Sequence, residues 1–123
     1  MDISLQRELA RLLAALRREG RQQSGLDPRL VPPDSQTAYR VAQMVTDDLG
    51  WQVTGWKTAA MKEEMQKALR TDQPIYGRVL TPLAASPLTV VHGKLCSPIP
   101  EAEYQVRLGS DLPPRAKPYA VEE

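Results

Sequence analysis

The chain has 123 residues, of which 41% are hydrophobic and 25% are charged, so it can form one folded domain with its own core. Its formal net charge is +1 and it has no long basic or acidic block, which excludes the charge pattern of proteins that bind nucleic acid or a membrane surface. Cys96 is the only cysteine, so an intrachain disulfide and a cysteine zinc cage are both excluded.

The N-terminal segment carries no sign of a signal peptide, because Arg7, Arg11, Arg17 and Arg18 interrupt its apolar residues. No apolar run in the sequence is long enough to cross a bilayer. These two features predict a cytoplasmic protein that contacts neither nucleic acid nor membrane.

Two amphipathic helices are predicted in an N-terminal helical region, residues 1–50. The first covers residues 4–19 and ends at Gly20; the second starts at a cap, Asp34 or Ser35, and ends at Gly50. The apolar positions with helical spacing are Leu5, Leu9, Leu12, Leu13 and Leu16 in the first helix, and Ala38, Val41, Ala42, Val45 and Leu49 in the second. We expect the two stripes to pack on each other or on a sheet.

Alternating residues from Trp51 to Lys57 predict a strand that begins the second region, residues 51–123. Lys57 falls on the same side as Trp51 and Val53, where desolvation disfavours its charge. Either the side chain leaves the apolar side at the strand end, or it faces a cavity with an anionic occupant.

Shorter elements are predicted to follow. Residues 59–69 have helical spacing, with methionines that we interpret as core filler, and residues 75–80 form a short strand. A loop over residues 82–87 and a strand over residues 88–91 come next, and His92 is interpreted as a loop residue rather than a ligand. Residues 112–118 are predicted to be extended, and a helix is predicted to begin at Tyr119.

Residues 99–108 alternate again and predict another strand, whose apolar side carries Ala102, Tyr104, Val106 and Leu108. Its polar side presents Glu101 and Glu103 about 7 Å apart along the strand. Two carboxylates that close repel each other unless a cation lies between them, and a hard divalent cation fits that need. The alternative is a solvated polar face on which Arg107 offsets the two charges.

Three stretches taken together resemble one family. In chain order they are Gly55-Trp56-Lys57, then Asp72-Gln73-Pro74 with Tyr76-Gly77, then Glu101-Ala102-Glu103 running to Leu108-Gly109-Ser110-Asp111-Leu112-Pro113. They are similar to the family of 2-keto-4-pentenoate hydratases, 2-oxohept-3-ene-dioate hydratases and oxalocrotonate decarboxylases, which belongs to the fumarylacetoacetate hydrolase superfamily. The Glu-Ala-Glu strand leading into the Leu-Gly-x-Asp-Leu-Pro turn is the most specific part of the resemblance.

The resemblance implies a site. Glu101 and Glu103 would hold Mg²⁺ or Mn²⁺ with a third acidic residue further along, and Lys57 and Asp72 would be the catalytic pair. Lys57, Gln73 and Tyr76 would bind the substrate, a small 2-oxo or 2-hydroxydienoic acid such as 2-hydroxypenta-2,4-dienoate.

The implied reaction is a divalent-metal-dependent hydration in the breakdown of aromatic compounds. A 2-oxo acid offers its carboxylate and 2-oxo oxygens to the metal, which acts as a Lewis acid. The same electron sink serves decarboxylation, so a decarboxylase or a C–C hydrolase of the superfamily stays open. A non-catalytic partner subunit is the alternative from another class.

The implied fold is α+β, with N-terminal helices packed on a short-stranded, mainly antiparallel sheet that is part of a larger β-roll. Family members are about twice as long, so we expect residues 51–123 to be the first part of the catalytic β-rich domain and the third metal ligand to lie beyond Glu123. Such a piece is expected to expose apolar surface and to form a homo-oligomer or a complex with a sister subunit. Lys57 is followed here by Thr58-Ala59-Ala60, where the family has a glycine and a serine.

Overall fold

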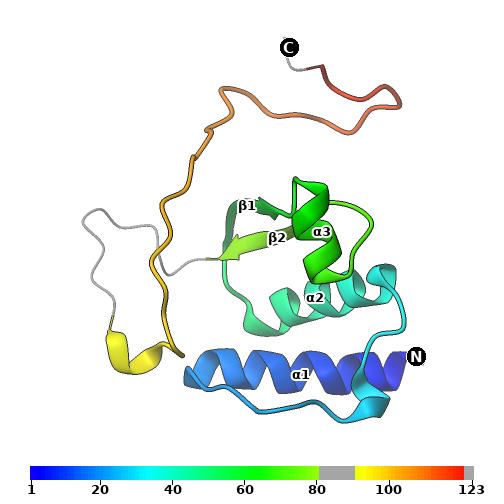
Figure 1. Ribbon diagram of the computed structural model, residues 1–123, viewed down its shortest axis with the longest axis vertical. Coiled ribbons are helices and arrows are strands. Elements are labelled where there is room, and N and C mark those ends of the chain that lie inside the picture. The colour runs from blue at the N-terminus through cyan, green and yellow to red at the C-terminus, as the bar shows by residue number, and fades with distance from the viewer. Residues whose placement is uncertain (81–90, 121–123) are drawn as a thin grey trace.

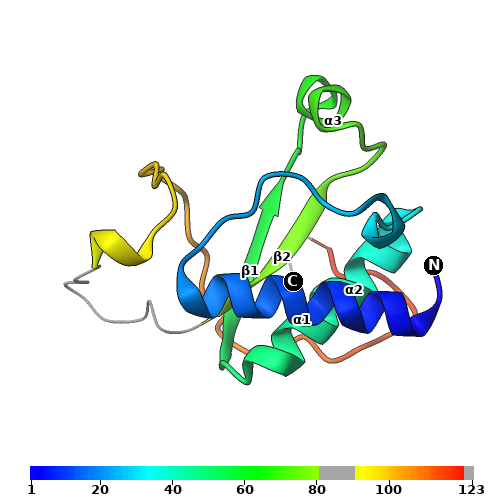
Figure 2. The ribbon, with the colours of Figure 1, turned by 90° about the horizontal axis from the view of Figure 1, so that it is seen from below.

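The computed structural model describes residues 1–80 and 91–120. Within these residues the fold is α+β, as predicted: three α-helices and one antiparallel pair of strands (Figure 1). Helices α1 and α2 lie side by side at one end, the two strands lie beside α2, and α3 caps the far end of the strands (Figure 2). Among the described helices, none has the length and apolar character needed to cross a membrane.

The two N-terminal helices end where predicted, and the first begins one residue earlier than predicted. Helix α1 (Ile3–Glu19) is capped by Asp2, whose carboxylate accepts from the backbone N–H of Ser4 and Leu5. Helix α2 (Ser35–Leu49) is capped by Asp34, whose carboxylate accepts from the N–H of Thr37 at 2.7 Å. Each helix is followed by a left-handed glycine, Gly20 with φ 62° and Gly50 with φ 64°, a conformation that glycine adopts without strain.

The core lies between α1, α2 and the 3-10 turn η1 (Pro28–Leu30). Its buried residues are Leu9, Ala10, Leu30 and Val41. A second cluster joins the helices to the sheet, because Ala14 of α1 and Leu49 of α2 pack against Leu80 at the end of the second strand. Ala14 has no exposed surface, and Arg18 ties the helix ends together by donating to the carbonyl oxygen of Asp48.

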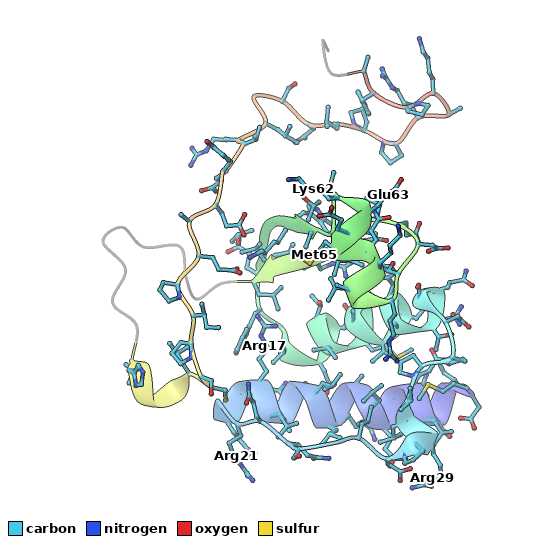
Figure 3. All side chains as sticks on the ribbon, viewed as in Figure 1. Arg17, Arg21, Arg29, Lys62, Glu63 and Met65 are labelled. Atoms are coloured by element: carbon cyan, nitrogen blue, oxygen red, sulfur yellow. The ribbon has the colours of Figure 1, made fainter. Side chains whose placement is uncertain are left out.

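Strands β1 (Val53–Ala59) and β2 (Ile75–Leu80) form the sheet, with Lys57 opposite Gly77 and Trp56 opposite Arg78. The second strand has the predicted bounds. The first starts two residues later than predicted, because Trp51 packs against the cluster of Ala14, Leu49 and Leu80 instead of joining the ladder. Arg17 lies over the Trp51 ring at 5.9 Å, on the side of α1 that faces the sheet (Figure 3).

Helix α3 (Glu63–Leu69) is shorter than the predicted helix over residues 59–69. Residue Ala59 still belongs to β1, and Ala60 takes a positive φ of 58°, which a helix does not allow. The interpretation of Met61 and Met65 as core filler is wrong in the described structure, since both side chains are exposed. Figure 3 shows Met65 on α3 together with Lys62 and Glu63, at the end of the sheet away from α1.

Residues 95–120, here called the arm, extend away from the helices and pass the sheet (Figure 1). The strand predicted over residues 99–108 does not form, because no other strand among the described residues pairs with it. Its expected core face is exposed instead: Tyr104 is 105% exposed and Val106 is 84% exposed, and Ala102 and Leu108 are exposed as well. Exposed apolar surface was expected of such a chain, and the arm carries much of it.

The remaining predictions divide between described and undescribed residues. His92 begins a short 3-10 turn, η2 (His92–Lys94), as a non-strand residue. The predicted loop over 82–87, most of the predicted strand over 88–91 and the end of the helix predicted from Tyr119 lie outside the described residues. The larger β-roll stays a prediction.

Candidate metal and substrate site

Lys57 projects from β1 on the face of the sheet that points away from the helices. Side chains alternate between the faces of a strand, and the neighbouring residues Trp56 and Tyr76 lie on the helix side, where Tyr76 stacks on Tyr39 of α2. The face of Lys57 also carries Gly55 and Gly77. A Cβ added to either glycine would meet nothing within 4 Å, so the space around Lys57 is open.

The arm brings Glu101 and Glu103 to this open face. The Lys57 Nζ donates to Oε2 of Glu101 at 2.8 Å and lies 3.1 Å from Oε1 of Glu103. Three of the residues singled out from sequence therefore meet, although Lys57 precedes the two glutamates by more than forty positions. Both glutamates converge on the ammonium group of Lys57. They do so from an extended segment, not from the predicted strand.

Ion pairing favours the charged forms of Lys57 and Glu101. Hydrogen bonds to Glu101 and then Glu103, together with their negative charges, raise the pKa of Lys57 above its ordinary value. The hydrogen bond from Lys57 lowers the pKa of Glu101 in turn. All three side chains are more than half exposed, so solvent screens the pairing and its contribution to folding is small.

Two carboxylates on one cation fit part of a hard-metal site. Magnesium is commonly held by one or two carboxylates, with water or substrate oxygens completing its octahedral shell. Glu101 and Glu103 provide such a pair, with Lys57 Nζ at the point where they converge. No cluster of three or more His, Cys, Asp or Glu side chains suited to a metal occurs in residues 1–80 and 91–120. The donor set here is therefore a pair that depends on further oxygen ligands.

The other predicted residues lie apart from this cluster. Asp72 and Gln73 are exposed in the turn between α3 and β2, beyond the last pair of the ladder, Ala59 with Ile75. No hydrogen bond or ion pair links Asp72 to Lys57 within the described ranges. The Tyr76 side chain lies on the helix side of the sheet, opposite to Lys57. The roles predicted for all of these residues stay predictions.

The helix side holds a second group that the sequence analysis did not bring together, although it had named Tyr76 as a substrate contact. Tyr39 and Arg40 of α2 face Trp56 of β1 and Tyr76 and Arg78 of β2 across a hollow of about 300 Å³. The alternation of residues in β2 already placed Tyr76 and Arg78 on one face of the strand. Only the strand register shows that Trp56 lies on the same face, because it places Arg78 opposite Trp56.

Comparisons with known proteins found two relatives that are named for the same activity. No family model matches the chain, and no solved structure matches it significantly. The chain is 32% identical over 115 residues to 2-keto-4-pentenoate hydratase 1 of Dechloromonas aromatica (strain RCB), and equally so to 2-keto-4-pentenoate hydratase 2 of the same organism. Each match covers 90% of this chain and 44% of the relative. The chain is thus similar, over most of its own length, to less than half of a 2-keto-4-pentenoate hydratase.

Proposed function

We propose that this chain is part of a divalent-metal-dependent hydratase of the 2-keto-4-pentenoate hydratase family, acting on 2-hydroxydienoic or 2-oxo acids. The observation that carries the proposal is the meeting of Lys57 with Glu101 and Glu103 on the open face of the sheet. The similarity to two proteins named as hydratases supports the same activity.

Glu101 and Glu103 are proposed to hold Mg²⁺ or Mn²⁺, which when bound supplies Lewis acidity to the 2-oxo end of the substrate. Their two negative charges favour a cation at the place where they converge. The carboxylate and 2-oxo oxygens of the substrate supply ligands that the pair lacks.

Lys57 is proposed to bind the substrate carboxylate through its ammonium group. A carboxylate attracts the ammonium as the glutamates do, and the open space over Gly55 and Gly77 admits a small acid beside it. If the glutamates held a metal, Lys57 would no longer be needed to balance their charge and would be free to bind the substrate.

Asp72 is proposed as the group that moves protons, and Gln73 as a further substrate contact. Both lie in one exposed turn at the end of the sheet where the β1–β2 ladder stops, so they reach the Lys57 face only at its edge. Tyr76 was also predicted to bind the substrate, but its ring stacks on Tyr39 on the helix side of the sheet, so no substrate contact is proposed for it here.

Metal binding by the glutamate pair is tested with the chain itself. Mn²⁺ is titrated in the presence of oxalate, which mimics the metal-binding end of a 2-oxo acid, and bound metal is followed by electron paramagnetic resonance. Binding is expected to disappear in Glu101→Ala and to persist in Glu64→Ala, a matched change at an exposed acid of α3. Equal binding by both variants, or none in the unaltered chain, would contradict the proposal.

A second candidate is a non-catalytic partner subunit. The observation that favours it is the exposed apolar series of the arm, in which Tyr104 and Val106 find no partner among the described residues. Sedimentation analysis distinguishes the two candidates when combined with the metal titration. Self-association without metal binding would support the subunit, and metal binding lost in Glu101→Ala would support the hydratase.

A further inference from the structure

The hollow between α2 and the helix side of the sheet has the features of a small binding site. Its volume is about 300 Å³, at the lower end of the range for pockets that take small ligands. Three elements supply its walls: Tyr39 and Arg40 come from α2, Trp56 comes from β1, and Tyr76 and Arg78 come from β2. Neither the hydratase proposal nor the similarity to known proteins gives this hollow a role.

Flat aromatic surfaces form part of the wall. The rings of Tyr39 and Tyr76 are stacked with centroids 4.3 Å apart and 10° between their planes, and the Trp56 ring meets Tyr76 edge-on at 5.8 Å. The backbone N–H of Tyr76 donates to the hydroxyl oxygen of Tyr39, which holds the stack in place. Trp56 is 58% exposed, so part of its aromatic surface remains available to a planar ligand.

Positive charge accompanies the rings. The guanidinium of Arg78 lies over the Trp56 ring at 4.9 Å, and Arg40 donates to the hydroxyl oxygen of Thr37 at 2.9 Å. Among residues 1–80 and 91–120, no carboxylate lies within ion-pair distance of either arginine, and no acidic residue lines the hollow. Each guanidinium has five N–H donors, so donors remain for a ligand carboxylate, which it can bind through two parallel hydrogen bonds.

We propose that this hollow binds a planar aromatic carboxylate, whose ring stacks on the exposed aromatic side chains and whose carboxylate pairs with Arg78 and Arg40. The site is separate from the hydratase site, because Lys57 projects from the opposite face of the same strands. Its occupant is a small acid with delocalised electrons, because the walls join flat rings to two guanidinium groups that form no ion pair with the described carboxylates.

Benzoate is the probe, titrated into the isotope-labelled chain and followed by the indole N–H signal of Trp56 and the amide signal of Tyr76. Saturable shifts of both signals are expected with benzoate. Cyclohexanecarboxylate, with the same charge and no flat ring, and benzamide, with the ring and no charge, are expected to bind at least about tenfold more weakly, as the loss of one good interaction of roughly 1.4 kcal/mol implies.

Variants then assign the contact. Arg78→Gln is expected to weaken benzoate binding about tenfold or more. Arg40→Gln is expected to weaken benzoate binding too, but by a smaller factor. Arg107→Gln removes the same charge from the arm and is expected to leave binding unchanged. A dispersed amide spectrum verifies that each variant is folded.

Three results would overturn the proposal. They are equal benzoate affinity in Arg78→Gln and the unaltered chain, equal affinity for benzoate and cyclohexanecarboxylate, and shifts centred on Lys57 that disappear in Lys57→Gln. The third would assign the anion to the hydratase site, so failure of this proposal remains distinguishable from failure of the proposed function.

Discussion

The helical pair α1 and α2 and the arm of residues 95–120 both carry regular apolar patterns, yet only the helical pair buries them. Leu9 in α1 is 2% exposed, whereas Val106 in the arm is 84% exposed. A helix satisfies its backbone hydrogen bonds within its own segment, so two helices need only bring their stripes together. A strand needs a neighbouring strand for its backbone, and the arm has none among the described residues. Apolar patterning therefore stabilises a segment only where a partner is present.

The largest effect is expected in the buried helical interface. Leu9→Ala removes a side chain from the cluster with Ala10, Leu30 and Val41, and should lower the free energy of unfolding by about 2–5 kcal/mol. Urea unfolding followed by circular dichroism measures the loss. A loss below about 0.5 kcal/mol would mean that α1 and α2 do not form the stabilising core.

A smaller effect is expected where the helices meet the sheet. The stacked pair Tyr39 and Tyr76 joins α2 to β2, and such pairs contribute about 0.5–1.5 kcal/mol beyond their buried area. A double-mutant cycle of Tyr39→Leu and Tyr76→Leu, measured by urea unfolding, should give a coupling energy in that range. Additive single effects would show that the two rings do not stabilise each other.

The helix caps predict a dependence on acid. The hydrogen bond from the N–H of Thr37 holds the pKa of the Asp34 carboxyl below its ordinary value of 3.8. The stabilisation by this carboxylate is therefore complete above pH 3.8 and is lost as the pH falls through the lower pKa of the folded state. Asp34→Asn keeps an acceptor without the titration, so its thermal midpoint should fall less on acidification. An equal fall of the thermal midpoint in Asp34→Asn and in the unaltered chain would contradict a stabilising role of the Asp34 carboxylate at the start of α2.

The smallest effect is expected in the arm. Val106→Ala should change the free energy of unfolding by less than about 0.5 kcal/mol, because the side chain has no packing to lose. The same urea measurement used for Leu9→Ala provides the contrast. A clear destabilisation at Val106 would mean that the arm packs against a partner, either a second copy or further sequence.

Local signals predicted the helices well. The end of α1 at Gly20, both caps of α2 and the bounds of β2 follow from nearby residues, since Asp34 and Gly50 act on the backbone beside them. The errors in the other bounds have two causes. Trp51 packs against the cluster of Ala14, Leu49 and Leu80, so β1 begins after it. Ala60 has a positive φ, so α3 begins later than predicted. The strand predicted over residues 99–108 does not form, because it has no neighbouring strand among the described residues. Alternating residues in one segment cannot show whether such a neighbour exists.

The candidate site divides in the same way. The motifs singled out Lys57, Glu101 and Glu103, and the fold brings them together. Asp72 and Tyr76 were predicted from the same motifs, but the turn and the strand alternation direct them elsewhere. The hollow around Trp56 and Arg78 was not predicted, because it depends on strand register and on the contact with α2.

The junction between the arm and α1 offers a built-in reporter. The Cys96 thiol is partly buried and lies 3.0 Å from the carbonyl oxygen of Gly20, which it can use as a hydrogen-bond acceptor. Because the sequence has one cysteine, alkylation by a thiol reagent monitors this single point of the molecule. A shielded thiol reacts slowly, so the alkylation rate reads out how often the arm detaches from the end of α1, without any engineered label.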